Sequence, residues 1–204
     1  MANKYEGGML LDYLSNSGTN ELETERLFLR KFKESDALDI YVNWASDKDS
    51  AKYNAWSVHP HLEVTKEYLS EWIESYKNND YYHWAIVHKE KEEVIGSISV
   101  SNINRRKKYC EVGYTIAKKM WNLGIATEVL IRVIKYLTEE AGFETIRALH
   151  DVRNEASGRV MKKAGMTYVK NKTLFLLSRN HLIMRCCVYE YKRQTQALGK
   201  QKWQ

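Results

Sequence analysis

Met120-Trp121-Asn122-Leu123-Gly124-Ile125-Ala126-Thr127-Glu128 is the segment from which the organisation of this chain can be worked out. It lies between a predicted strand, residues 111–116, and an apolar pattern of helical period that begins near Ile125. A turn of small residues between a strand and a helix leaves several backbone N–H groups unpaired at the positive end of the helix dipole. The segment therefore predicts a binding site for a phosphate or pyrophosphate group.

The composition is that of a folded protein, and the length allows one large domain or two very small ones. The chain has 204 residues, of which 44% are hydrophobic, so a packed core is expected and global disorder is not. No apolar run approaches the roughly 18–20 residues of a membrane span. The first ten residues also lack the basic and apolar segments of a signal peptide. We therefore expect no membrane association and a cytoplasmic location.

The three cysteines, Cys110, Cys186 and Cys187, show neither metal-finger spacing nor a C-x-x-C redox pattern. Each lies in a strand-like segment, where a thiol behaves as a small apolar side chain. A reducing cytoplasm fits this usage best.

The net charge of +6 suits an anionic partner, an acidic ligand or simply a basic surface. Most basic residues are spread along the chain, apart from residues 105–108 and the tail. Aromatic and basic residues do not alternate as they do in RNA-binding sheets. Nucleic acid is therefore disfavoured as the main partner.

Periodicity divides the chain into a variable arm (1–22), a single domain (23–192) and a basic tail (193–204). A first strand around Leu27 and Leu29 is followed by a helix that Ser35 and Asp36 cap, and by a second helix over residues 64–76. The remaining predicted strands are 82–88, 94–101, 109–116, 145–152, 166–170 and 182–191, and the remaining helices begin near Ile125 and at Asn154.

The predicted order is β-α-α-β-β-β-α-β-α-β-β. Three successive strands without helices between them exclude a uniform doubly wound sheet, and the later strand-helix-strand unit adds a parallel pair. An α/β fold with a mixed sheet follows from this order.

Three segments together resemble the GNAT N-acetyltransferase superfamily, and within it the RimJ/RimL-like branch. They are the strand Glu111-Val112-Gly113-Tyr114-Thr115-Ile116, the segment Trp121 to Glu128, and Asn154-Glu155-Ala156-Ser157-Gly158-Arg159-Val160-Met161-Lys162-Lys163-Ala164-Gly165-Met166. The resemblance implies a mainly antiparallel mixed sheet of about seven strands flanked by about four helices. It also implies an acyl-CoA-dependent N-acetyltransferase, with acetyl-CoA as co-substrate, no metal, and a primary amine as acceptor.

The resemblance assigns most of the candidate site to coenzyme A. The backbone of the strand would pair with the pantetheine arm and the loop would hold the pyrophosphate. Trp121 stands where the superfamily usually has Gln or Arg, so backbone donors carry the phosphate contacts. The expected cofactor-binding residues are Tyr114, Thr115, Ile116, Asn122, Leu123, Gly124, Ile125, Ala126, Thr127, Asn154 and Ser157.

Two side chains are candidates for proton transfer. Glu111 would accept the proton of the amine through water, because an amine of pKa near 10 is almost wholly protonated at neutral pH. A salt-bridged strand carboxylate is the alternative reading of Glu111, and Glu128 and Asp151 are weaker candidates. Ser157 would be the acid for the departing thiolate, or else would bind coenzyme A or the helix backbone. A covalent route through Cys110 is disfavoured, because no histidine adjoins it in sequence.

The acceptor is not readable from the sequence. The loop that holds Tyr53, Trp56 and the pair His59 and His61 lines the acceptor pocket or is exposed, and no further ligand supports a metal reading of the histidines. Tyr81, Tyr82 and Trp84 wall the acceptor cleft or belong to the core. The acceptor could be a small-molecule or peptide amine, including the N-terminus of a ribosomal protein. The chain could also form a homodimer. The alternative functions are non-catalytic acyl-CoA binding and association with the ribosome or RNA.

Overall fold

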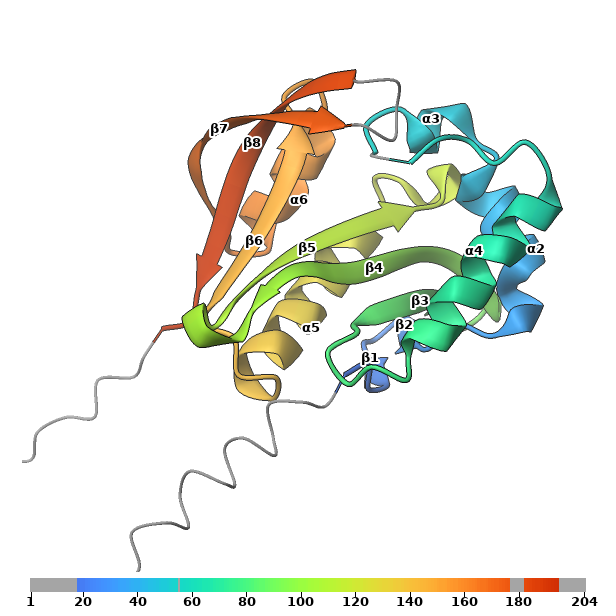
Figure 1. Cartoon of the computed structure of the whole chain (residues 1–204), viewed down its shortest axis with the longest axis horizontal. Coiled ribbons are helices and arrows are strands. Elements are labelled where there is room, and N and C mark those ends of the chain that lie inside the picture. The colour runs from blue at the N-terminus through green and yellow to red at the C-terminus, as the bar shows by residue number, and fades with distance from the viewer. Residues whose placement is uncertain (1–17, 55, 177–181, 195–204) are drawn as a thin grey trace, which may run out of the picture.

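A single mixed sheet organises the computed structural model, which describes residues 18–54, 56–176 and 182–194 (Figure 1). Every neighbouring pair of strands is antiparallel except β5 and β6, which are parallel. Along the sheet the described strands lie in the order β1 (Leu22–Glu23), β2 (Leu27–Arg30), β3 (His83–His88), β4 (Glu93–Asn104), β5 (Tyr109–Ile116), β6 (Thr145–Asp151), β8 (Leu182–Lys192) and β7 (Thr167–Leu176).

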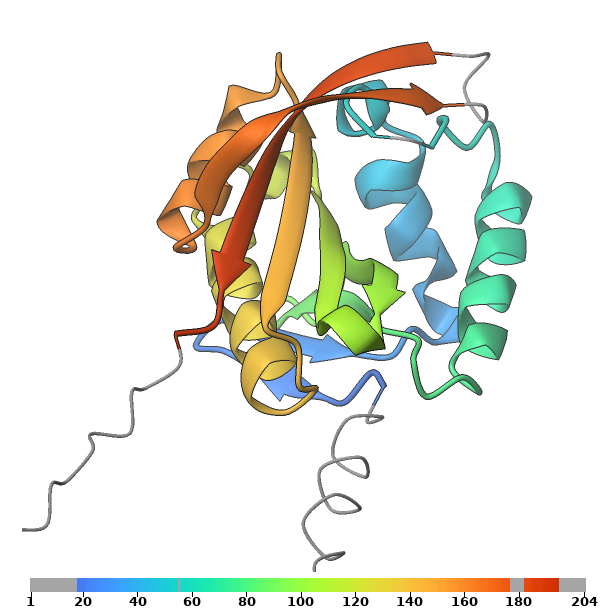
Figure 2. The same cartoon turned by 60° about the vertical axis from the view of Figure 1, so that its left-hand side comes forward.

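The helices cover both faces of the sheet (Figure 2). One face carries α2 (Ala37–Ile40), which continues into a π-helical turn, together with α3 (Lys48–Ala51) and α4 (Leu62–Ser75). The other face carries α5 (Ile125–Glu139), the crossover between the parallel strands β5 and β6, and α6 (Glu155–Lys163). A parallel pair requires such a crossover connection, because a tight hairpin reverses the chain direction.

Each face has its own apolar cluster. Under α5, the buried side chains of Val129, Val133 and Leu137 pack with those of Val112 and Ile146. Under the helices α2 and α4, a smaller cluster contains Phe32, Ile40, Trp44, Leu69 and Ala85. Each large apolar side chain removed from water contributes ~1.5–3 kcal/mol, so these clusters hold both helical layers to the sheet.

The parallel pair β5 and β6 separates partway along its length. Backbone pairing extends from Tyr109 opposite Thr145 to Val112 opposite Ala148 and then stops. β4 continues to pair with β5 as far as Ile116. Among the described residues, no strand pairs with the edge of residues 113–116 that faces β6, and the two strands diverge as a V (Figure 1).

The mixed α/β fold expected from the sequence is confirmed, with eight strands and five α-helices among the described residues. The two additional elements are short: β1 has two residues and α3 has four. α3 follows the N-cap Asp47, whose side chain accepts hydrogen bonds from the Asp49 and Ser50 N–H groups at 3.1 and 3.3 Å. Four residues are too few for a periodic apolar pattern, which explains why the sequence pattern misses this helix.

Two other boundaries differ from the sequence prediction. β7 extends to Leu176 rather than ending near Lys170, because each residue from Lys170 onward pairs with β8. A 3₁₀ turn over Glu34–Asp36 precedes α2, so helical structure begins after Lys33. Asp36 stands at the N-cap position of α2, as predicted, but its carboxylate accepts from the Lys33 N–H at 2.8 Å rather than from an N–H group of α2.

The boundaries of the proposed arm and tail lie close to the sheet. Leu22 of the arm is buried in β1, and Thr19 accepts a hydrogen bond from the His83 N–H at 2.9 Å. The rest of the arm, residues 1–17, and the tail from residue 195 lie outside the described residues. No helix in the described ranges combines the length and the apolar character that a membrane span requires.

Candidate functional site

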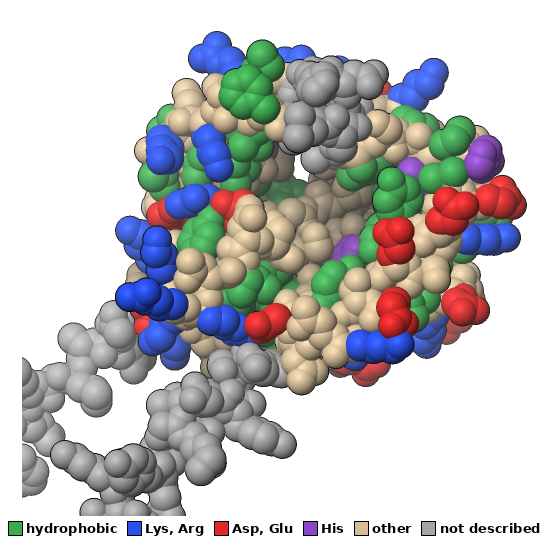
Figure 3. Space-filling model, in the orientation of Figure 1, with side chains coloured by type: hydrophobic (Ala, Val, Ile, Leu, Met, Phe, Trp, Pro, Cys, Tyr) green, Lys and Arg blue, Asp and Glu red, His purple; other side chains and the backbone are tan. Residues whose placement is uncertain are grey.

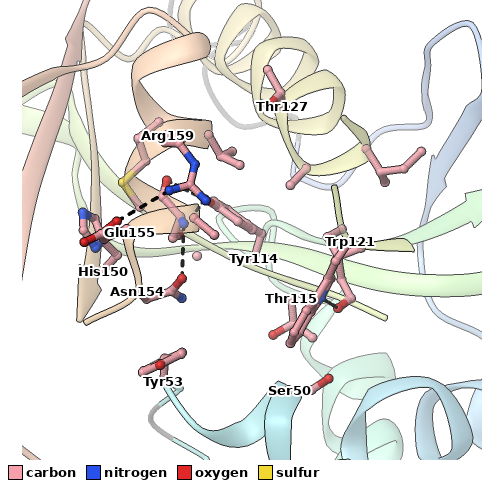
Figure 4. A pocket seen from close by; sticks show the side chains of 18 of the residues that line it. Ser50, Tyr53, Tyr114, Thr115, Trp121, Thr127, His150, Asn154, Glu155 and Arg159 are labelled. Carbon is pink, nitrogen blue, oxygen red and sulfur yellow. Dashed lines mark hydrogen bonds and ion pairs between the residues drawn. The ribbon is translucent and has the colours of Figure 1, made fainter. Parts of the chain in front are cut away.

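A cavity of about 690 Å³ opens where β5 and β6 diverge. Its walls are the exposed edge of β5, the first turns of α5 and α6, and the segment from α3 to Asn54 (Figure 4). On the face seen in Figure 3 the molecule is hollowed over β4 and β5, between the β7–β8 hairpin and α4. Strand divergence thus creates space where an ordinary parallel sheet would be closed.

The loop before α5 supplies one wall of the cavity. Asn122 and Gly124 both have left-handed backbone conformations, with φ of 63° and 79°. Gly124 is the N-cap and has no side chain to bond the helix start, and the first backbone bond runs from the Glu128 N–H to the Gly124 oxygen at 3.0 Å. The N–H groups of Ile125, Ala126 and Thr127 therefore remain available to a ligand. Left-handed residues next to a helix start form an anion-binding concavity.

An ion pair supports this loop from behind. The Arg26 guanidinium bonds the Glu128 carboxylate at 2.6 and 2.8 Å and donates to the Leu123 carbonyl oxygen at 3.0 Å. Burial of Glu128 opposes its ionisation, but hydrogen bonds from Thr24 and Arg26 outweigh it and lower the Glu128 pKa. Glu128 therefore faces β2 and holds the loop, and it is not one of the cavity-lining residues.

Most of the loop residues expected at the cofactor site line the cavity. Asn122, Gly124, Ile125, Ala126 and Thr127 do so, whereas the Leu123 side chain is 54% exposed and lies outside the lining.

Trp121 places a flat apolar surface in the cavity (Figure 4). Its indole Nε1–H donates to the Ile116 carbonyl oxygen at 2.8 Å, which holds the ring against the end of β5. This residue therefore contributes shape rather than charge to the cavity wall.

Tyr114, Thr115 and Ile116 of β5 also line the cavity, as expected. The Asn54 side-chain amide donates to the Thr115 hydroxyl at 3.1 Å and so links the loop after α3 to the strand. The backbone groups on the free edge of β5 have the geometry of an open sheet edge, which an extended chain can pair with.

The start of α6 forms the opposite wall. The Asn154 side-chain oxygen accepts a hydrogen bond from the Ser157 N–H at 3.2 Å, which confirms Asn154 as the N-cap. The Ser157 hydroxyl lies 2.7 Å from the hydroxyl of Tyr114, which belongs to β5 on the other side of the cavity. Burial raises the Tyr114 pKa to about 12, although the bond to Ser157 opposes this. A neutral phenol and an alcohol thus meet in the cavity.

The two carboxylates expected on the strands lie outside the cavity lining. Glu111 accepts hydrogen bonds from the Tyr109 hydroxyl and from the Asn102 amide at 2.6 Å, and an Arg147 nitrogen lies at 3.5 Å. Asp151 bonds the Arg153 guanidinium at 2.6 and 2.8 Å, and this arginine lowers the Asp151 pKa. Both carboxylates therefore have cationic partners.

Cys110 is fully buried in the core, and burial raises its thiol pKa to about 12. A thiol with so high a pKa is a weak nucleophile at neutral pH, so the geometry gives no support to a covalent route.

Several cavity-lining residues were not singled out from the sequence: Asp49, Ser50, His150, Arg153, Glu155, Arg159 and Lys163. Arg159 and Lys163 are four residues apart on α6, a spacing that places them on one helix face and that was readable from the sequence. The sequence does not identify the α3 residues Asp49 and Ser50 as site residues, because its pattern does not predict that helix.

His150 is 9% exposed, and its Nδ1 lies 2.8 Å from the Asp151 carbonyl oxygen. Because a carbonyl oxygen only accepts, Nδ1 carries the proton. Among the described residues, none forms a hydrogen bond with the buried Nε2.

The aromatic residues divide between cavity and core. Tyr53 lines the cavity, whereas Tyr82 and Trp84 are fully buried in the core. His59 is also buried, bonds the Thr65 hydroxyl at 2.8 Å and stacks on a tyrosine of α4, and burial lowers its pKa. In the part of the chain that the structure describes, histidine, cysteine and acidic side chains form no cluster of three that could hold a metal ion.

Known proteins resemble the chain in sequence and in fold. It is 28% identical over 144 residues to the uncharacterized N-acetyltransferase YoaA of Bacillus subtilis, covering 71% of this chain and 81% of that protein. The ribosomal-protein-S5-alanine acetyltransferase of Vibrio fischeri superposes with a TM-score of 0.73 at 23% identity, covering 85% of this chain and 96% of the other. The microcin C7 self-immunity acetyltransferase MccE, solved with acetyl-CoA and AMP, superposes with a TM-score of 0.72 at 18% identity, covering 83% and 94%.

A sequence model of one family matches residues 26–167, a span that begins at β2 and reaches the start of β7. It therefore includes the divergence of β5 and β6 and both helix starts at the cavity. The chain belongs to the family of the acetyltransferase (GNAT) domain.

Proposed function

We propose that this protein moves an acetyl group from acetyl-CoA to a primary amine by direct attack in a ternary complex. The observation that carries the proposal is the meeting of two open backbone sites in one cavity of about 690 Å³. The free edge of residues 113–116 pairs with the pantetheine as an added strand would. The Gly124-capped start of α5 binds the pyrophosphate.

The proposed chemistry needs three contributions from the protein. Orientation brings the amine against the acetyl carbonyl, and a backbone N–H of β5 stabilises the oxyanion. Glu111, acting through water, accepts the proton that the amine must lose. Ser157 donates to the sulfur as the thiolate leaves, because its hydroxyl is in the cavity beside Asn154.

The acceptor is a small-molecule or peptide amine. A ribosomal-protein N-terminus, the acceptor class of the RimJ/RimL-like branch, is one candidate, and the S5-alanine acetyltransferase of Vibrio fischeri supports it by its fold alone. MccE, solved with acetyl-CoA and AMP, supports acetyl-CoA as the donor. We place the reaction in the cytoplasm, and a homodimer is compatible with it.

A thermal-shift and turnover screen tests the proposal. Coenzyme A at one hundred times its Kd is expected to stabilise the fold by about 2.7 kcal/mol. Acetyl-CoA consumption is then measured over ribosomal-protein N-terminal peptides, polyamines, aminoglycosides and amino acids. Absence of any stabilisation by coenzyme A rejects the proposal. Stabilisation without acetylation of any amine assigns the chain to non-catalytic acyl-CoA binding, and tight RNA binding that persists when the Gly124 loop is disrupted favours association with RNA.

Glu111→Gln tests the proton acceptor against a matched control. Arg147 lies between Glu111 and Glu190 and bonds Glu190 at 2.6 Å, so Glu190→Gln removes a neighbouring carboxylate of the same network. We expect Glu111→Gln to lower kcat about 100-fold and Glu190→Gln to leave it within a few-fold of the wild type. Equal effects of the two variants would assign Glu111 to the ion-pair network alone.

A further inference from the structure

Tyr114 and Ser157 form a side-chain bridge between the two walls of the cavity. Tyr114 belongs to β5 and Ser157 to the first turn of α6, 43 residues later, and their hydroxyl oxygens lie 2.7 Å apart. Both residues line the cavity (Figure 4 labels Tyr114). Their bond spans the gap where β5 and β6 have separated.

Either hydroxyl can donate this hydrogen bond, and the surroundings favour Tyr114 as the donor. The Tyr114 hydroxyl also lies 3.4 Å from the Ser157 carbonyl oxygen, which can only accept. A proton on the Tyr114 oxygen that points toward Ser157 therefore serves both contacts. A phenol is also a better donor than an aliphatic alcohol. With Tyr114 as donor, the proton of the Ser157 hydroxyl is free to point elsewhere in the cavity.

The Ser157 main chain is held as well. Its N–H donates to the Asn154 side-chain oxygen at 3.2 Å, which fixes the first turn of α6. The Asn154 contact thus fixes the Ser157 main chain, and the Tyr114 contact orients its hydroxyl group. Hydrogen bonds in such a chain polarise one another, so a hydroxyl that accepts from a phenol becomes a stronger donor.

We propose that Tyr114 is a positioning residue for Ser157: it donates to the Ser157 hydroxyl, which in turn donates to the sulfur of coenzyme A. This role rests on the proposed function and adds a residue whose side chain acts through Ser157. No proton needs to leave Tyr114, because the effect is on the strength and direction of the Ser157 hydrogen bond. The expected consequence is stabilisation of the thiolate that departs from the acetyl group.

The other titratable or charged side chains of the cavity lining are present in the wild type and in a Tyr114 variant alike. They are Asp49, Tyr53, His150, Arg153, Glu155, Arg159 and Lys163. A difference between the two proteins in the ionisation of a bound thiol therefore reports the Tyr114 hydroxyl.

The test is a pH titration of the coenzyme A thiol bound to the full chain, followed by thiolate ultraviolet absorbance against a desulfo-coenzyme A reference. A hydrogen bond to a charged group is strong enough to move this midpoint by about one pH unit. We expect Ser157→Ala to raise the midpoint by about one unit, and Tyr114→Phe by about half a unit. Tyr168→Phe is the matched control, because that hydroxyl bonds Asn171 outside the cavity.

The double variant Tyr114→Phe/Ser157→Ala is expected to match Ser157→Ala, since Tyr114 acts through Ser157. Replacement of Tyr114 by 3-fluorotyrosine keeps the ring and makes the phenol a stronger donor, and burial keeps this phenol protonated in the titrated range, so the midpoint should fall. This variant also tests the role of the Tyr114 hydroxyl if Tyr114→Phe does not fold. An unchanged midpoint with the fluorinated residue, or additive shifts in the double variant, overturns the role of Tyr114.

Acetyl transfer is measured separately on the same proteins, because the thiol titration needs no amine. A wild-type protein that binds no coenzyme A overturns both the proposed function and this role. A wild type that acetylates an amine, together with a Tyr114→Phe midpoint equal to that of the wild type, overturns the role alone.

Discussion

The helices α5 and α6 both begin at the cavity, but their first turns are capped in different ways. α5 follows Gly124, which has no side chain to offer the helix. α6 follows Asn154, whose own side chain accepts from the Ser157 N–H. The first helix start keeps its donors open, whereas the second uses one internally and presents a hydroxyl side chain instead. The helix dipole is common to both, so the cap decides which start is open to an anion.

Each helix start is also held by an ion pair whose carboxylate lies outside the cavity lining. Glu128 of α5 bonds Arg26 of the β2 edge, and Asp151 at the end of β6 bonds Arg153 just before α6. The carboxylate partner of the second pair is 1% exposed and that of the first is 20% exposed. The anchors are thus similar in chemistry, which leaves the caps as the main difference between the two walls.

The largest expected effect comes from placing a carboxylate at each helix start in turn. Gly124→Asp puts a negative charge where the proposed pyrophosphate binds, in a left-handed conformation that Asp tolerates. Repulsion of about 3 kcal/mol at a partly exposed site corresponds to a roughly 100-fold weaker Kd for coenzyme A. Calorimetric titration with coenzyme A measures the change.

Asn154→Asp is the matched control for Gly124→Asp. Asp is as good an N-cap as Asn, so the bond to the Ser157 N–H is retained. We expect coenzyme A to bind less than about tenfold more weakly, because this cap is already occupied by its own side chain. Equal losses of affinity in the two variants would mean that the cap does not distinguish the helix starts.

The difference between the caps could be read largely from the sequence. Gly124 before one apolar helix pattern and Asn154 before another predict the two helix starts, and the structure confirms both. The divergence of β5 from β6 could not be read in the same way, because pairing that stops after Val112 leaves no local pattern.

Side-chain partners were less predictable than helix boundaries. Glu111 was recognised as a strand carboxylate, but its contacts with Asn102 and Arg147 come from two other strands. The Tyr114–Ser157 bond joins residues 43 positions apart. Contacts of this range depend on strand order and register, which periodicity along one chain does not specify.

The second prediction concerns the close packing of the start of α6 against His150. A methyl group at Gly158 would lie 2.8 Å from His150 Nε2 and 3.1 Å from its Cε1. The ring has little freedom to move, because Nδ1 donates to the Asp151 carbonyl oxygen. Gly158→Ala should therefore lower the free energy of unfolding by ~1–3 kcal/mol in urea titrations.

Two further variants test the cause of that loss. Gly113→Ala is the control, because an added methyl group there has no atom of the described residues within 4 Å, apart from its chain neighbours. In a His150→Ala background the cost of Gly158→Ala should shrink, as expected for residues in direct contact. If Gly158→Ala lowers the free energy of unfolding by the same amount in that background, the loss arises from the helix backbone and not from contact with the imidazole.

A smaller effect is expected from removing the α6 cap. Asn154→Ala leaves the Ser157 N–H without its side-chain acceptor and should lower the free energy of unfolding by ~1 kcal/mol. Asn154→Ser keeps an acceptor at the cap and should recover most of the loss. The two urea midpoints measure the difference, and equal midpoints would show that the cap contributes nothing to stability.

The smallest effects concern the two ion pairs and their pH dependence. Arg153 lowers the Asp151 pKa, and Thr24 and Arg26 lower that of Glu128 against the opposing effect of burial. A carboxyl group whose pKa is depressed by folding contributes stability above its unfolded pKa, near 4, and loses it as the pH falls through the folded value. Arg153→Gln and Arg26→Gln should therefore be less stable than the wild type at neutral pH and approach it in acid.

Urea titrations in steps from neutral pH to about pH 2.5 pass through the ordinary pKa values that both carboxyl groups have in the unfolded chain. Arg153→Gln leaves a nearly fully buried carboxylate without its cationic partner, whereas Glu128 in Arg26→Gln keeps the Thr24 hydroxyl at 2.6 Å. We therefore expect Arg153→Gln, at the start of α6, to lose more pH-dependent unfolding free energy than Arg26→Gln. A constant difference from the wild type at every pH would show that lost packing, and not the ion pair, destabilises the variant, because removal of arginine methylene contacts is insensitive to protonation. The two anchors would then be equivalent, and the contrast between the helix starts would rest on Gly124 and Asn154 alone.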